Sequence, residues 1–268
     1  MEENEKLFQK AIEYVREVGK NLIKKDLPLE ISYKGKTDFV TQMDIYVQKQ
    51  LEEFLKDIAP DFQLLAEEKD NKDIDTKGNL WILDPIDGTT NFIHGFCHSG
   101  ISLAMAEQGE VIGGIVYLPY TDELFIAFKG KGAYCNGKQI HVSKSEKLED
   151  SLLSIGTNPQ ERDRADKAFS VMRYFYDQCH DIRRVGAASV ELCYVAAGRL
   201  DGYLEHGLKT WDYAAGAIIV KEAGGLCTDY YGESIDCEGK RDVVATNGII
   251  HEEAIKQLLV GIGKEFQE

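Results

Sequence analysis

The stretch Trp81-Ile82-Leu83-Asp84-Pro85-Ile86-Asp87-Gly88-Thr89-Thr90-Asn91-Phe92 is the most informative part of the sequence. Its first three residues predict a short apolar strand, and two carboxylates, Asp84 and Asp87, follow three residues apart. Pro85 and Gly88 constrain the backbone between and after them, so both carboxylates can turn into one pocket and bind hard cations through oxygen. If Gly88 and Thr89 open a helix, their amides would face an anion. A β-turn capped by aspartates needs Asp-Gly but not this whole combination, which instead favours metal-assisted phosphoryl transfer.

Two further acidic positions fit the same pocket. Glu67 and Glu68 end a predicted strand over residues 62–65, just upstream of the motif. Asp212 follows Trp211 at the start of an apolar helix. A Glu-Glu pair alone is typical of a solvated surface, and a first-turn aspartate alone is favoured by the helix dipole. Their position beside the motif makes them candidate metal ligands.

Hydrophobic periodicity divides the chain into two halves. Apolar residues at helical spacing predict helices over 4–24 and 41–55, the second with Thr41 as its N-cap and Asp44 in its first turn. Residues 101–106, 111–118 and 123–128 then predict strands of a largely antiparallel sheet, and Asn136-Gly137 predicts a tight hairpin. After residue 150, strands and helices alternate, which predicts a second sheet with helices against it. The predicted strands there are 152–155, 182–185, 202–205 and 243–245, and the predicted helices are 161–178, 187–197, 211–223 and 252–260. We expect one unit over 1–268 with sub-domains of about 1–150 and 151–268.

The composition excludes several classes of function. Apolar residues make up 43% and charged residues 29% of the chain, which is typical of a globular protein rather than a disordered one. The formal net charge of -15 disfavours nucleic acid and anionic lipid as partners. No apolar run approaches the ~20 residues of a membrane span, and the charged N-terminus does not resemble a signal peptide. None of the six cysteines forms a Cys-x-x-Cys pair, so we expect free thiols in the cytoplasm.

These motifs together resemble the inositol monophosphatases, within the wider magnesium-dependent, lithium-sensitive sugar-phosphatase superfamily. The resemblance covers nearly the whole chain. It rests on Ala66-Glu67-Glu68, on the stretch from Trp81 to Phe92, and on Trp211-Asp212-Tyr213-Ala214-Ala215-Gly216 followed by Glu222-Ala223-Gly224-Gly225. It implies a layered α–β–α–β–α sandwich of the inositol monophosphatase and fructose-1,6-bisphosphatase type, a homodimer, and hydrolysis of a small phosphorylated metabolite by metal-activated water.

The resemblance also implies residue roles. Glu67, Asp84 and the Ile86 carbonyl resemble ligands of a first Mg²⁺, and Asp84, Asp87 and Asp212 ligands of a second. A third ion is implied near Glu67. The catalytic residues would be Asp44 and Thr89, which orient the attacking water, together with Glu67. Lys36 would lie in a loop that approaches the cleft. The residues implied to bind substrate are Asp87, Gly88, Thr89, Gly186, Ala187, Ala188 and Glu205.

One departure leaves the substrate open. Relatives that prefer inositol phosphate usually carry a hydroxyl residue directly after the glycine of the alcohol pocket, whereas this chain has Gly186-Ala187. Alternatives with the same chemistry are the 2′-phosphate of NADP, fructose 1,6-bisphosphate and a nucleotide 3′-phosphate. The carboxylate of Glu205 suits polyol hydroxyls and argues mildly against bisphosphates. A non-catalytic binding or regulatory protein on this scaffold is a second alternative, but all four metal-site carboxylates are present.

Overall fold

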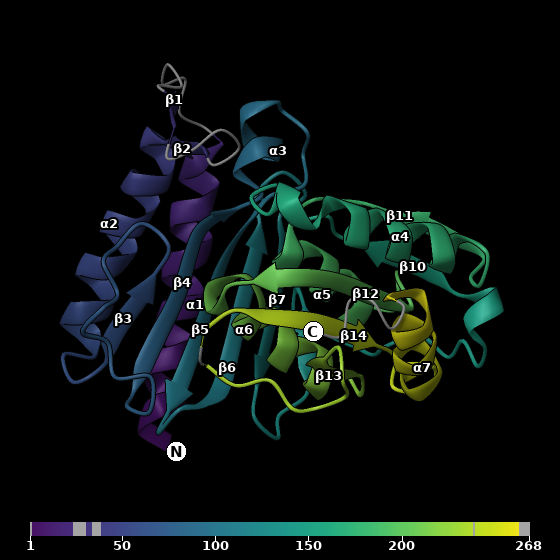
Figure 1. Ribbon diagram of the computed structural model, residues 1–268. Coiled ribbons are helices and arrows are strands. Elements are labelled where there is room, and N and C mark those ends of the chain that lie inside the picture. Colours follow the sequence, from purple (N-terminus) through teal and green to yellow (C-terminus); the bar gives the residue numbers. More distant parts are fainter. Residues whose placement is uncertain (1, 24–30, 34–38, 238, 263–268) are drawn as a thin grey trace.

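Two β-sheets separated by a layer of helices form the frame of the molecule (Figure 1). The computed structural model describes residues 2–23, 31–33, 39–237 and 239–262. Within them, the larger sheet has seven strands, and only its first pair is parallel. Its strands, in spatial order, are β3 (Gln63–Ala66), β4 (Leu80–Asp87), β5 (Gly100–Glu107), β6 (Glu110–Leu118), β7 (Glu123–Phe128), β8 (Ala133–Cys135) and β9 (Lys138–Ile140).

The second sheet has five strands and mixed pairing. Its central strand β12 pairs in parallel with β10 and antiparallel with β14, so the sheet is built from strands far apart in the chain. A separate pair, β1 (Ile31–Tyr33) and β2 (Phe39–Thr41), lies near the N-terminal helices. The spatial order of the five strands is β11 (Asp181–Arg183), β10 (Leu152–Ile155), β12 (Gly202–Leu208), β14 (Arg241–Thr246) and β13 (Leu226–Asp229).

Helices cover both outer faces and fill the space between the sheets. α1 (Glu2–Leu22) and α2 (Gln42–Ile58) pack on the outer face of the larger sheet. α5 (Ala188–Ala196) and α6 (Thr210–Glu222) lie between the sheets. α4 (Ala165–Tyr176) and α7 (His251–Ile262) cover the far face of the smaller sheet (Figure 1). The predicted α–β–α–β–α sandwich is therefore confirmed.

Strand β4 shows how the sequence separates these layers. Successive side chains of a strand point to opposite faces. Trp81 and Leu83 are buried against α1 and α2, whereas Leu80 and Ile82 are buried in the core that contains α5 and α6. Such an apolar run, buried on both faces, is expected for a strand in the middle of a layered fold.

Most predicted elements are confirmed, and the differences are local. α2 begins after Thr41, whose hydroxyl accepts from the amide of Asp44 while Asp44 accepts from the amide of Thr41. The hairpin at Asn136-Gly137 joins β8 to β9. The helix predicted over 161–178 is split into a 3₁₀ turn, Arg162–Arg164, and α4. Strands β1, β2 and β13 were not predicted, and the helix considered to open at Gly88 and Thr89 is the short α3 (Thr89–Ile93). In the described part of the chain, no helix has the length and apolar content that spanning a membrane requires.

Candidate active site

A cleft of about 370 Å³ opens where the end of β4 meets the starts of α5 and α6. Asp44 lies behind it, in contact with Thr89. Lys36 lies outside the described residues. The predicted site residues that line the cleft are Glu67, Asp84, Ile86, Asp87, Gly88, Thr89, Gly186, Ala187, Ala188, Glu205 and Asp212.

The end of β4 presents its two aspartates through an irregularity in the sheet. The β4–β5 register shifts between Asp84 and Asp87, at the position of Pro85. Proline has no N–H to donate to a neighbouring strand and is tolerated at such bulges. Gly88 then adopts a φ of 81° as the N-cap of α3. A Cβ at Gly88 would lie 2.9 Å from that of Ala187, so both conformation and space require glycine here.

Glu67 and Asp212 reach the cleft from other elements. Glu67 follows β3, and the side chain of Gln48 bonds both the amide and the carbonyl of the next residue, Glu68. Asp212 lies in the first turn of α6, where its Oδ2 accepts from the amide of Lys209 at 2.7 Å. The four predicted carboxylate ligands therefore come from the residue after β3, from β4 and from α6.

Asp44 and Thr89 form a pair beside these carboxylates. The Oγ1 of Thr89 lies 3.3 Å from Oδ1 of Asp44 and 3.0 Å from the carbonyl oxygen of Ile86, so its single proton can be donated to either acceptor. The other oxygen of Asp44 is occupied by Thr41 as part of the α2 cap. Burial raises the pKa of Asp44 to about 6, although hydrogen bonds from Thr41 oppose this shift. The pair has the geometry expected for a hydroxyl that a carboxylate activates.

The carboxylates of the cleft repel one another. Burial raises the pKa of Asp84 well above its usual range, and the charges of Glu67, Asp87 and Asp212 add to this effect. Burial also raises the pKa of Asp212, again with a contribution from Glu67. A buried set of carboxylates is favourable only if a cation offsets its charge.

The donor set fits a hard divalent cation. All the predicted ligands are oxygens, which Mg²⁺ prefers over the nitrogen and sulfur ligands of transition metals. As the side chains are placed, no group of three or more His, Cys, Asp or Glu residues in the described ranges is arranged to hold an ion. A bound cation would therefore require these carboxylates to rotate toward it.

The side of the cleft predicted to bind the alcohol differs from the side predicted to bind metal. Ala187 is buried and contributes no polar side-chain atom. Both oxygens of Glu205 already accept hydrogen bonds, Oε1 from the amide of Asn158 at 2.8 Å and Oε2 from the hydroxyl of Tyr203 at 2.6 Å. Three positively charged side chains, Arg162, Arg184 and Lys209, also line the cleft.

Sequence reasoning did not assign several residues that shape the site. The Nδ2 of Asn91 donates to the carbonyls of His98 and Val185 and so ties α3 to the segment before α5. Ser189 binds Asp87, and Arg184 reaches the cleft from the end of β11. Asn91 belongs to the quoted motif, which could have flagged it. The other two carry no sequence signal, because their partners lie far away in the chain.

Comparison with known proteins gives a consistent result. The model of the inositol monophosphatase family matches residues 3–262. The chain is 40% identical to an inositol-1-monophosphatase of Rhizobium meliloti over 204 residues, 76% of this chain and 77% of the relative. It is 36% identical to the Nus factor SuhB of Xylella fastidiosa, over 89% and 88% of the two chains.

A solved structure agrees with the fold. An IMPase/NADP phosphatase complexed with Mg²⁺ and phosphate superposes with a TM-score of 0.82 at 30% identity, over 96% of this chain and 95% of the other. The family match over nearly the whole chain, the identity to curated relatives and the shared layered fold lead to one conclusion. The chain belongs to the inositol monophosphatase family, a family of phosphatases.

Proposed function

We propose that this protein is a Mg²⁺-dependent phosphatase that hydrolyses small phosphate monoesters, with inositol monophosphate as the leading substrate. One observation carries the proposal: Glu67, Asp84, Asp87 and Asp212 line a single cleft at the start of α3, where a phosphate would meet backbone amides. The solved relative that contains Mg²⁺ and phosphate supports the same chemistry.

Two or three Mg²⁺ ions would be held by Glu67, Asp84, Asp87, Asp212 and the Ile86 carbonyl. Bound there, they would neutralise phosphate charge and make water more acidic. Thr89 and Asp44 would orient the attacking water, with the Thr89 hydroxyl donating to Oδ1 of Asp44 and accepting from the water. Glu67 would take part in activating water, and Gly88 and Thr89 would bind phosphate through their amides.

The alcohol that leaves is less well defined than the metal chemistry. Gly186, Ala187, Ala188 and Glu205 would contact it. The absence of a hydroxyl at Ala187 removes one group that could bind a polyol, at a cost of about 1 kcal/mol in selectivity. The alternatives are NADP 2′-phosphate, fructose 1,6-bisphosphate and a nucleotide 3′-phosphate, and one solved relative is named an IMPase/NADP phosphatase.

Phosphate release with Mg²⁺ from a small panel tests the proposal. The panel contains inositol 1-phosphate, NADP, fructose 1,6-bisphosphate, adenosine 3′,5′-bisphosphate and glycerol 2-phosphate. If inositol 1-phosphate has the highest kcat/KM, the proposal of inositol monophosphate as substrate is supported. If another compound has the highest kcat/KM, that compound replaces it as the proposed substrate. No hydrolysis of any compound at any Mg²⁺ concentration would overturn the phosphatase proposal.

That last outcome would favour a non-catalytic or regulatory role. The relatives named Nus factor SuhB are the observation in its favour, because their name describes a factor rather than an enzyme.

We also propose that the protein acts in the cytoplasm as a homodimer. Six free cysteines support the location. The exposed aromatic rings of Phe169 and Tyr176 on α4 support an association surface, which sedimentation velocity would test.

A further inference from the structure

Arg184 is held at the mouth of the cleft in a defined position. Its Nε donates to Oγ1 of Thr157 at 3.1 Å, which joins the end of β11 to the loop after β10. A Cβ at Gly186 would lie 3.0 Å from Nη1 of Arg184, so the guanidinium lies directly over that glycine. Arg184 is exposed and pairs with no carboxylate among the described residues. Its guanidinium lines the cleft and is not held in an ion pair there.

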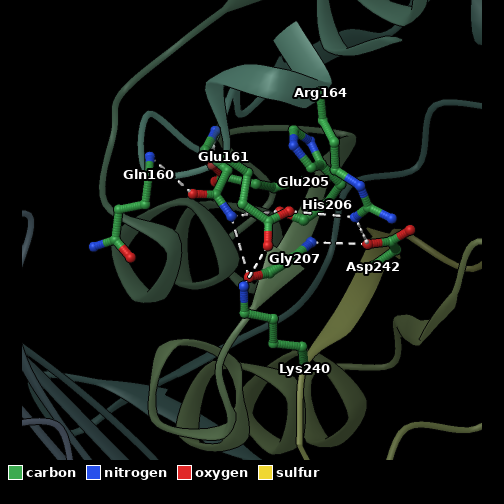
Figure 2. A network of polar contacts seen from close by, with 9 residues as sticks. Gln160, Glu161, Arg164, Glu205, His206, Gly207, Lys240 and Asp242 are labelled. Atoms are coloured by element: carbon green, nitrogen blue, oxygen red, sulfur yellow. Dashed lines mark hydrogen bonds and ion pairs between the residues drawn. The ribbon is translucent and has the colours of Figure 1, made fainter. Parts of the chain in front are cut away.

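Arg162 also lines the cleft, and it belongs to a loop that ion pairs hold in place. Figure 2 shows the loop around Gln160 and Glu161 held against β12 and β14 by polar contacts. Glu161 pairs with Lys240 and Arg164, and Arg164 also approaches Asp242 at 3.8 Å. These contacts lie on the side of the loop away from the cleft, whereas Arg162 lines the cleft and has no ion pair with a described residue. The loop thus presents one uncompensated cation to the site.

The carboxylate of Glu205, which also lines the cleft, already accepts hydrogen bonds from other residues. Glu205 is buried, and its two oxygens accept from Asn158 and Tyr203. Burial raises the pKa of Glu205, and the charge of Arg184 is among the influences that oppose this. Arg184 is therefore close enough to offset part of the charge of Glu205, the carboxylate nearest to this group of cations. This weakens the argument from Glu205 against bisphosphates.

We propose that Arg184 and Arg162, assisted by Lys209, form a subsite for a second anionic group on the substrate, such as another phosphate. The inference rests on the proposed phosphatase function and narrows its substrate class to phosphate monoesters that carry a second negative charge. In a protein with a net charge of -15, these three cations line the cleft beside its five carboxylates, and they are the side chains there that can attract an anionic group directly. Guanidinium groups suit phosphate because they bind it through two parallel hydrogen bonds.

Matched substrate pairs test the subsite. Fructose 1-phosphate is compared with fructose 1,6-bisphosphate, and adenosine 3′-phosphate with adenosine 3′,5′-bisphosphate, by kcat/KM with Mg²⁺. We expect the bisphosphate to be preferred about tenfold or more in at least one pair, and that pair identifies a sugar or a nucleotide as the carrier. Arg184→Gln and Arg162→Gln should each reduce this preference about fivefold or more, mainly through KM. Equal values within both pairs, or equal losses for both members of a pair, would overturn the subsite.

Arg183→Gln is the matched control, because Arg183 is the neighbouring residue but pairs with Asp181 and does not line the cleft. It should leave the preference unchanged. Calorimetric titration of the same four compounds in Ca²⁺ separates the two proposals. Tighter binding of a bisphosphate without turnover in Mg²⁺ would uphold the subsite and overturn the phosphatase function. Equal binding within both pairs would overturn the subsite whether or not phosphate is released.

Discussion

The hydroxyl of Ser189 lies 2.5 Å from Oδ2 of Asp87, and the amide of Ser189 donates to the same oxygen at 2.6 Å. Asp87 ends β4, and Ser189 lies in the first turn of α5, 102 residues later. The carboxylate therefore caps a helix of the central layer while it lines the cleft. Two donors on one oxygen fix the orientation of a predicted metal ligand.

Ser189→Ala should weaken metal binding. Alanine keeps the helix and the amide bond to Asp87 but removes the hydroxyl, which contributes about 1 kcal/mol. We expect the Mg²⁺ concentration for half-maximal activity to rise about fivefold, with a smaller change in kcat. Calorimetric Mg²⁺ titration gives a readout independent of turnover. Ser151→Ala is the control, because that serine donates to the carbonyl of Lys147 away from the cleft. Equal Mg²⁺ affinity in the Ser189 variant and wild type would contradict the positioning role.

Asp87→Asn should abolish turnover and leave the fold intact. The asparagine carbonyl can still accept from Ser189, so the cap on α5 remains. The loss of one negative charge weakens the predicted second metal site, and we expect kcat to fall at least a hundredfold, on the order of 3 kcal/mol. Thermal unfolding by circular dichroism checks the fold, and phosphate release checks the activity. Near-normal turnover would show that the two-metal assignment is wrong.

Long periodic segments made much of the fold predictable. The apolar run from Trp81 to Leu83 and the cap at Thr41 are local signals, and both are found as expected. The four-residue strand β13 was missed because its partly polar sequence gains strand structure only by pairing with β14. Helix α3 could be considered only as a start at Gly88 and Thr89, because its five residues give no periodicity. Strand β4 continues to Asp87 because the bulge at Pro85 lets pairing resume.

The site was predictable as a set of residue types but not as a network. Carboxylates at the ends of strands and helices identified the cleft from sequence. The contacts of Asp87 with Ser189 and of Asn91 with Val185 join residues about a hundred positions apart across the central layer, so no local pattern contains them. The same holds for Arg184 and Thr157. The metal-binding and catalytic roles, and the division into sub-domains near residue 150, stay predictions.

Chelation should remove activity reversibly. Burial and mutual repulsion raise the pKa of Asp84 and Asp212, so cation removal leaves these carboxylates without compensation. We expect no phosphate release after dialysis against EDTA and full recovery with Mg²⁺. Because a ligand that binds only the folded state stabilises it, the unfolding midpoint should also rise with Mg²⁺ concentration. Activity that survives exhaustive chelation would exclude the metal mechanism.

A further buried acid lies near Glu205, which is predicted to bind the alcohol. Glu191 of α5 is fully buried, and its Oε1 accepts from Ser154 Oγ at 2.6 Å and from the amide of Val185 at 3.0 Å. Its Oε2 has no hydrogen-bond partner among the described residues. Burial raises the pKa of Glu191 to about 8, and the charges of Glu205 and Asp87 contribute to this. The protonated form therefore dominates in the folded protein at neutral pH.

This shift predicts that Glu191 makes the protein less stable as pH rises. Between the unfolded pKa of about 4.3 and the folded value, the folded state holds a proton that the unfolded state has lost, so unfolding becomes easier with each unit of pH. The glutamine of the Glu191→Gln variant cannot ionise and has nearly the same shape as the protonated glutamate. Its stability relative to wild type should increase from pH 5.5 to pH 8.5 by about 3 kcal/mol.

Urea unfolding in EDTA at pH 5.5, 7 and 8.5 measures this difference. The absence of divalent cations matters because Asp87 is near Glu191, and a metal bound to Asp87 would alter the field that Glu191 experiences. Glu149→Gln is the control, since Glu149 is exposed and pairs with Lys147. Its stability difference from wild type should be the same at all three values of pH. Parallel pH curves for wild type and Glu191→Gln would mean that Glu191 is ionised in the folded protein, and that Ser154 and Val185 stabilise its charge enough to offset burial.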